Sequence, residues 1–210
     1  MFKLGKRGQG GTTLIELMIG LAIIAFMLSL GLPSMNNWLV TNKARSAGEF
    51  YADGFTMARR QALSHNASSR IVLTPNALSG QMNWQVDICF PVPGTPCNSS
   101  SGSWSTTAAR ASNDPEGAAG YTSIFRSADA LSKSTILLPS VEPVGATTVY
   151  FTALGWVDTN FADRLTRIRL DPAARYNGAI PAVALAVTLA GIAVKCNPTI
   201  AAPDSRACPP

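Results

Sequence analysis

The sequence is poor in histidine and in closely paired cysteine. Histidine occurs once in 210 residues, at His65, which excludes any metal site or proton relay that needs two or three histidines. None of the four cysteines belongs to a C-x-x-C pair, which excludes zinc-ribbon and thioredoxin-like sites. No pattern of acid, base and nucleophile stands out either. We therefore expect no catalytic residues, no metal and no cofactor, and a protein that is not an enzyme.

Charged residues are also scarce. They make up 14% of the chain, whereas average soluble proteins carry roughly 25%. The mean hydropathy is +0.16 and the formal net charge is +5. This balance argues against a disordered chain and against a highly charged arm for nucleic acid. It indicates apolar surface held in a membrane or a subunit interface, on a chain long enough for one domain with an anchor.

The N-terminus joins a short basic segment to a long apolar one. Residues 1–11 contain three basic residues and no acid, and the 21 residues 12–32 carry one charge, Glu16. As a helix those residues would be about 32 Å long, enough to cross a hydrocarbon layer of roughly 30 Å. The basic flank predicts a cytoplasmic N-terminus with the rest of the chain outside.

Three ordinary explanations compete for this apolar run. A cleaved secretory signal has a shorter apolar region and a small-x-small cleavage site, whereas SMNNWLV follows here. A plain signal anchor explains the length and the basic flank, but it does not explain Glu16, because an acid at mid-membrane costs about 2.5–3.5 kcal/mol. A buried core helix would not need the basic leader.

The spacing of one glycine, one glutamate and one proline separates these explanations. In GGTTLIELMIGLAIIAFMLSLGLP, Gly11 stands five residues before Glu16, and Pro33 is the 22nd residue counted from Thr12. The segment resembles the type III signal of type IV pilins and pseudopilins, a family that usually has phenylalanine where Thr12 stands. The resemblance implies cleavage between Gly11 and Thr12 by prepilin peptidase, and N-methylation of the new N-terminus.

The resemblance implies that the glutamate of this signal takes part in filament assembly. Cleavage leaves an ammonium on Thr12, and staggered helices can bring Glu16 of one subunit to the ammonium of its neighbour. Charges in an apolar bundle are stabilising only when they are paired. In the alternative, Glu16 interacts with its own helix N-terminus, which contributes about 0.3–1 kcal/mol. The predicted assembly residues are Glu16 and Pro33.

The apolar segment is expected to continue as an amphipathic helix and to be followed by strands. Apolar residues recur at spacings of three and four over 34–65, so a helix bent at Pro33 is predicted from about 12 to 64. The expected fold is α+β, a long helix packed on an antiparallel sheet as in pilins, with residues 91–120 as a long loop. Strands are expected at 69–74, 84–90, 122–126, 134–138, 147–152, 165–170, 183–189 and 192–196.

The order of segments in the head narrows the resemblance. ARRQALSHNASSRIVLTP, then VYFTALGWV and finally ALAVTLAGIAVKC resemble the GspH/FimT branch of minor pilins and pseudopilins. This implies a subunit near the tip of a type IV pilus or a type II secretion pseudopilus. Its implied partners are other pilins or pseudopilins, prepilin peptidase, the inner membrane and the assembly platform. The predicted parts are a leader (1–11), a transmembrane and filament-core helix (12–33), its amphipathic continuation (34–65) and a periplasmic β-rich head (66–210).

The implied location is the bacterial inner membrane, with one span and a periplasmic head, and then the filament tip. In such an oxidising space the four cysteines are expected to form disulfides. Of three possible connectivities we choose Cys89–Cys97 and Cys196–Cys208, the second closing the C-terminal tail as in many pilins of this family. Free, buried cysteines are the alternative.

The basic residues at the C-terminal end of the chain are the basis of a second functional hypothesis. After residue 163 the sequence has six basic residues and two acids, Asp171 and Asp204. Some FimT-type pilins bind DNA through a C-terminal Gly-Arg-x-Arg, but Ile-Ala-Val follows Gly191 here. The alternative is therefore a DNA-binding minor pilin for uptake that uses phosphate contacts without sequence specificity. Its candidate contacts are Arg167, Arg169, Lys195 and Arg206.

Overall fold

The computed structural model describes residues 13–99, 103–178 and 180–209. They belong to two compact units, the first ending at Leu39 and the second comprising Val40–Pro210. The second unit is the head domain. The predicted leader, and the cleavage site between Gly11 and Thr12, lie outside the described residues.

One helix, α1 (Leu14–His65), agrees closely with the helix expected over 12–64. It begins with a cap: the backbone N–H of Glu16 donates to Oγ1 of Thr13 over 3.3 Å. Thr13 and Glu16 have the spacing of a capping box, a helix start signal that was not among the sequence predictions. The helix continues through Pro33, and the bend expected there stays a prediction.

The end of α1 also has a local cause. Asn66 follows the helix with φ of 46°, the left-handed conformation that asparagine tolerates better than most residues. The N–H of Ala67 then donates to the carbonyl of Ala62 over 3.1 Å. This is the hydrogen bond of a Schellman motif, and it stops the helix at His65.

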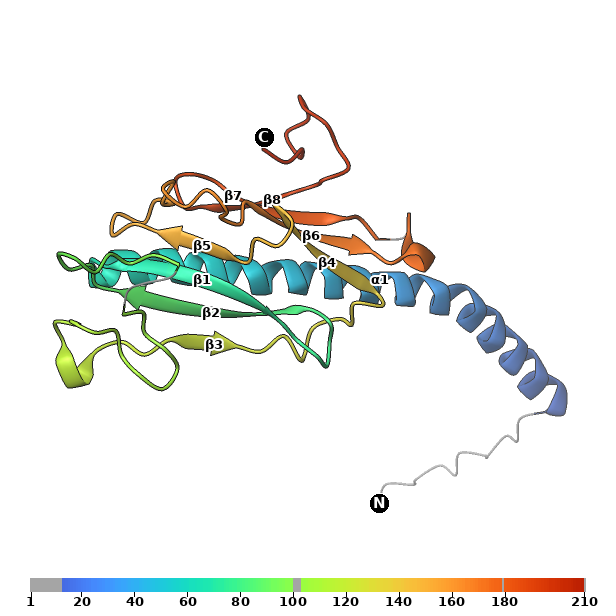
Figure 1. The fold of residues 1–210 in the computed structure, drawn as a ribbon. Coiled ribbons are helices and arrows are strands. Elements are labelled where there is room, and N and C mark those ends of the chain that lie inside the picture. The colour runs from blue at the N-terminus through green and yellow to red at the C-terminus, as the bar shows by residue number, and fades with distance from the viewer. Residues whose placement is uncertain (1–12, 100–102, 179, 210) are drawn as a thin grey trace, which may run out of the picture. The chain divides into compact units, whose positions relative to one another are not determined.

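After α1 the described residues form eight strands, each overlapping one of the strands expected from the sequence (Figure 1). Their boundaries differ from the expected ones by at most a few residues. The expected loop over 91–120 contains a short 3-10 turn, Gly117–Ala119, within its described part. The strands are β1 (Ser68–Pro75), β2 (Met82–Cys89), β3 (Ile124–Arg126), β4 (Leu137–Glu142), β5 (Thr148–Phe151), β6 (Arg167–Pro172), β7 (Val183–Val187) and β8 (Ala193–Cys196).

The expected α+β fold, a long helix packed on antiparallel strands, is confirmed, and the strands are divided between two four-stranded sheets. The orders are β3-β2-β1-β5 and β4-β6-β7-β8, with every pair antiparallel. Just before β6, the N–H of Leu165 donates to the carbonyl of Thr148 in β5 over 2.8 Å, which links the chain entering one sheet to the other sheet. Pairings such as β1 with β5 join segments far apart in the chain. Local alternation predicts where strands lie, but it does not determine which strands pair.

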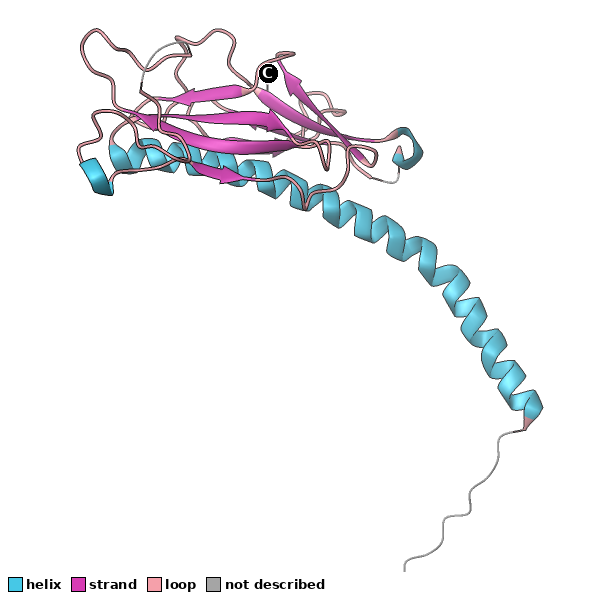
Figure 2. Cartoon of the chain, turned by 60° about the horizontal axis from the view of Figure 1, so that its bottom comes forward, coloured by secondary structure: helices cyan, strands magenta, loops and turns pink. Residues whose placement is uncertain are grey.

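The C-terminal half of α1 supplies one wall of the core. Figure 2 shows the strands lying on one side of this part of the helix. Six helix residues at spacings of three and four are 2% exposed or less: Ala44, Ala47, Tyr51, Phe55, Ala58 and Ala62. They pack with Ile71 and Val86 of one sheet and with Ile168 and Leu185 of the other. The whole core cluster therefore lies in the head domain.

Tyr51 ties the helix to both sheets. Its hydroxyl accepts a hydrogen bond from the N–H of Met82 over 2.9 Å and donates to Oε1 of Gln81 over 3.4 Å. Nε2 of Gln81 in turn donates to the carbonyl of Leu137, over 2.6 Å. Burial raises the pKa of Tyr51 to about 12. These polar groups are buried but paired, so they orient the helix without a large desolvation cost.

Two disulfides close loops of the head domain, with the pairing chosen from the sequence: Cys89–Cys97 and Cys196–Cys208. The first follows β2 directly. The second joins the end of β8 to the C-terminal tail. Cys196 clusters with two small buried residues of β7, Ala184 and Ala186, and Cys208 packs against this cluster. The tail is therefore held on the outer side of its sheet.

Gly54→Ala is expected to lower the free energy of unfolding by about 1–2 kcal/mol, although alanine favours helix by up to about 1 kcal/mol. A Cβ at Gly54 would lie 2.7 Å from Cδ1 of Ile71 and 3.0 Å from the ring of Trp84. Gly48→Ala is the matched control, since its Cβ would meet Val183 at an ordinary 3.6 Å. Urea unfolding followed by tryptophan fluorescence compares them, and a Gly54→Ala more stable than Gly48→Ala would contradict this packing.

Replacing both Cys196 and Cys208 by serine should cost about 2–3 kcal/mol, because the bridge closes a loop whose ends are 12 residues apart. Limited proteolysis should then cut the tail between 197 and 208. The matched control is the double replacement of Cys89 and Cys97, which should leave the tail protected. Equal cleavage of the tail in both variants would show that the second disulfide does not hold it.

Candidate functional site: the N-terminal helix and the charged residues of the head

The first turns of α1 expose apolar side chains in every direction. Every large apolar residue from 14 to 28 is more than half exposed, among them Leu14 at 77%, Phe26 at 67% and Met27 at 68%. A helix that is apolar all round is stable when it is buried in a membrane or among other helices. Within the first compact unit, the described residues leave this apolar surface uncovered.

By a hydropathy criterion applied to the described residues, no helix contains a stretch long and apolar enough to span a membrane. The membrane span expected over 12–33 stays a prediction.

Glu16 lies in the first turn of this apolar segment. Its backbone N–H is engaged by Thr13, which orders the turn, and the negative side chain is placed favourably at the positive end of the helix. Its side chain is exposed, and no lysine or arginine within the described ranges forms an ion pair with it. The carboxylate is thus free to meet a cation of another chain. Gly11 and Thr12, the other residues of the predicted signal, lie outside the described residues.

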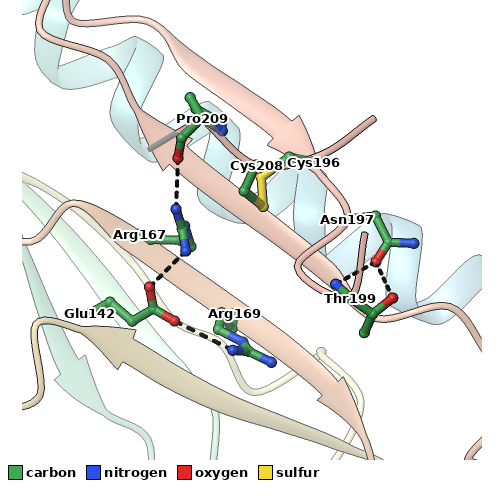
Figure 3. The surroundings of a disulfide bond; sticks show 8 residues. All are labelled: Glu142, Arg167, Arg169, Cys196, Asn197, Thr199, Cys208 and Pro209. Carbon is green, nitrogen blue, oxygen red and sulfur yellow. Dashed lines mark hydrogen bonds and ion pairs between the residues drawn. A yellow bond between two sulfur atoms is a disulfide. The ribbon is translucent and has the colours of Figure 1, made fainter. Parts of the chain in front are cut away.

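Two of the predicted DNA contacts, Arg167 and Arg169, share one carboxylate (Figure 3). Nη1 of Arg167 lies 2.9 Å from Oε2 of Glu142, and Nη1 of Arg169 lies 3.5 Å from Oε1. Nη2 of Arg167 also donates to the carbonyl of Pro209 over 2.8 Å, which fastens the tail to β6. The hydrogen bond from Arg169 to Asp171 raises the pKa of that guanidinium, and both arginines are paired with carboxylates.

The other two predicted contacts also have carboxylate partners. Lys195 on β8 forms an ion pair with Glu49 of α1. In the tail, Nε and Nη2 of Arg206 donate to the two oxygens of Asp204 over 3.1 and 2.8 Å. These bonds hold the pKa of the Asp204 carboxyl below its usual value.

The two acids counted after residue 163 are therefore not the only carboxylates that face the C-terminal cations. Glu142 and Glu49 also face them, from β4 and from α1. Glu142 stands directly opposite Arg167 in the pairing of β4 with β6. No local pattern could have shown this, because the partners are distant in the sequence. The four candidates also do not form one group: Arg167 and Arg169 share Glu142, while Lys195 and Arg206 have partners of their own.

Comparison with known proteins supports the prepilin-type signal read from the sequence. Residues 6–32 match the family model described as a prokaryotic N-terminal methylation motif. No curated protein matches the chain in sequence. Among solved structures, the type IV minor pilin FimU of Pseudomonas aeruginosa aligns with 73% of this chain and 87% of its own, with 16% identity and a TM-score of 0.41. The chain therefore carries the N-terminal methylation motif of prokaryotic prepilin-type proteins, followed by an α+β head of two antiparallel sheets.

Proposed function

We propose that the chain is a minor pilin or pseudopilin of the GspH/FimT type, a structural subunit near the tip of a type IV pilus or a type II secretion pseudopilus. One observation carries the proposal. The methylation motif at 6–32 coincides with a helix whose large apolar side chains, from 14 to 28, are all exposed. The motif provides a route to a processed N-terminus, and the exposed helix requires an apolar environment.

In this function the apolar helix has two successive environments. Before assembly, residues 12–33 anchor the chain in the inner membrane, with the N-terminus cytoplasmic and the head periplasmic. Prepilin peptidase cuts between Gly11 and Thr12. On assembly, helices of neighbouring pilins replace the lipid around the same side chains. The apolar surface does not face water at any stage, so the transfer avoids the cost of hydrating it.

Charge pairing then sets the position of each helix in the bundle. The ammonium left on Thr12 pairs with Glu16 of an adjacent subunit, because either charge alone in an apolar bundle is strongly unfavourable. The cap formed by Thr13 orders the first turn around Glu16. Pro33 lacks a backbone N–H and so omits one helical hydrogen bond, which lets α1 adjust to its neighbours.

The DNA-uptake alternative has no specific observation in its favour. Arg167, Arg169, Lys195 and Arg206 each have a carboxylate partner, and a phosphate backbone would have to compete with these partners. Contacts of these residues with DNA stay a prediction from the sequence, which a salt-dependent shift of DNA by the protein would test.

Gly11→Val is expected to block processing, because a residue without a side chain lets the peptidase approach the backbone at the cut. Intact-mass measurement of the membrane-bound protein should show wild-type chains starting at Thr12 and Gly11→Val chains that keep the leader. Gly8→Val, in the same leader but away from the cut, is the control and should be processed. A wild-type N-terminus beyond residue 32 would indicate an ordinary signal peptide instead.

Glu16→Gln is expected to be processed normally and to be absent from purified filaments. Glutamine can replace glutamate in a capping box, so this change keeps the local cap and removes the charge. Immunoblots of sheared filaments and of membranes measure the partition. Asp53→Ala, which removes an exposed carboxylate elsewhere on α1, should enter filaments as the wild type does. Normal entry of Glu16→Gln into filaments would contradict this pairing and would show that Glu16 interacts with its own helix N-terminus instead.

A further inference from the structure

The head domain contains a cavity of about 370 Å³ bounded by α1, β7, β8 and the C-terminal tail. Its apolar side is formed by three consecutive residues, 181–183, together with Gly48. Its basic side is formed by Arg45, Lys195 and Arg206, and no acidic residue is among the described residues that line it. Every lining residue falls between 45 and 206, within one compact unit. The cavity therefore combines a short apolar floor with a cationic rim.

The three cations of the rim retain hydrogen-bonding capacity. Arg45 is exposed and has no carboxylate partner anywhere in the described chain. Lys195 pairs with Glu49 through one of its three N–H donors. Arg206 uses Nε and Nη2 toward Asp204, which leaves Nη1. The rim thus has one uncompensated positive charge and several spare donors.

The wall formed by the tail is fixed in place. The disulfide between Cys196 and Cys208 joins its two ends. The N–H of Asn197 donates to the carbonyl of Arg206 over 2.7 Å, and the side chain of Asn197 accepts from Thr199 over 2.7 Å. A ligand entering this cavity does not have to order the tail, which reduces the entropic cost of binding.

We propose that this cavity binds an acidic peptide segment of a partner protein. An aliphatic side chain of that segment lies on the floor formed by Pro181, Ala182 and Val183, and its carboxylates accept hydrogen bonds at the rim, first from Arg45. Charge-assisted hydrogen bonds of this kind are stronger than neutral ones. The nearby acids of this chain, Glu49 and Asp204, are already paired, so the added carboxylates come from another chain.

The same features disfavour nucleic acid as the occupant. A phosphate backbone is bound by a row of cations, and Arg45 alone on this rim lacks a carboxylate partner. Bound single strands also use aromatic side chains for base stacking, and none lines the cavity in the described chain. An apolar floor beside a cationic rim matches an aliphatic side chain next to a carboxylate. The proposal goes beyond filament assembly and does not rest on it, because the cavity lies wholly in the head domain.

The test uses full-length protein in mild detergent and a fluorescent, end-blocked peptide, Glu-Leu-Glu-Leu-Glu, with binding followed by anisotropy. We expect saturable binding that Arg45→Glu weakens by about tenfold or more. Ala182→Trp, which fills the floor, should abolish binding. Arg60→Glu is the matched control, because Arg60 is an exposed arginine of α1 outside this cavity, and it should bind as the wild type does.

Four results would overturn the proposal: no saturable binding, equal binding of the Gln-Leu-Gln-Leu-Gln analogue, equal loss in Arg45→Glu and Arg60→Glu, or binding of oligothymidine in preference to the peptide. The last would assign the rim to phosphate recognition. Near-UV circular dichroism checks that each variant is folded. Arg45 is exposed, so Arg45→Glu is expected to fold. It therefore tests the proposal even if Ala182→Trp does not fold.

Discussion

The apolar surface of the first turns of α1 is the constraint on which the rest of the molecule depends. Eleven large apolar side chains between 14 and 28 are more than half exposed, on all sides of the helix. At roughly 25 cal/mol per Å², hydrating such a surface is too costly for a stable state in water. The helix therefore needs lipid or other helices around it. The basic leader, the processing motif and the lone Glu16 are all consistent with that need.

The second half of the same helix is buried against the sheets of the head domain. Ala47, Ala58 and Ala62 are fully buried and small, so the backbone approaches the sheets closely, and Gly54 allows contact with Ile71 and Trp84. Because the core cluster lies entirely in the head domain, its packing is independent of what surrounds residues 14–28. In the function proposed above, such a subunit exchanges lipid for protein around one part of its helix while the head stays folded.

Local sequence patterns predicted the elements well and their partners poorly. The helix limits and the places of all eight strands follow from periodicities of 3.6 and 2 and from turn residues. The spacing of Thr13 and Glu16 also predicts the cap at the start of the helix. The division into two sheets, the sharing of Glu142 by Arg167 and Arg169, and the meeting of Arg45 with Lys195 at one cavity all join residues distant in the chain. Such contacts depend on strand pairing, which one sequence does not determine.

The proposed assembly depends on a contact between the carboxylate of Glu16 and the N-terminal ammonium of a neighbouring subunit. Zero-length carbodiimide cross-linking of purified filaments, followed by mass spectrometry of the digested chains, tests this contact. We expect an amide between the side chain of Glu16 and the N-terminal amine of an adjacent subunit. Isotope labelling of one subunit population distinguishes links between chains from links within a chain. Filaments in which Glu16 forms no such link, while other carboxylates do, would contradict it.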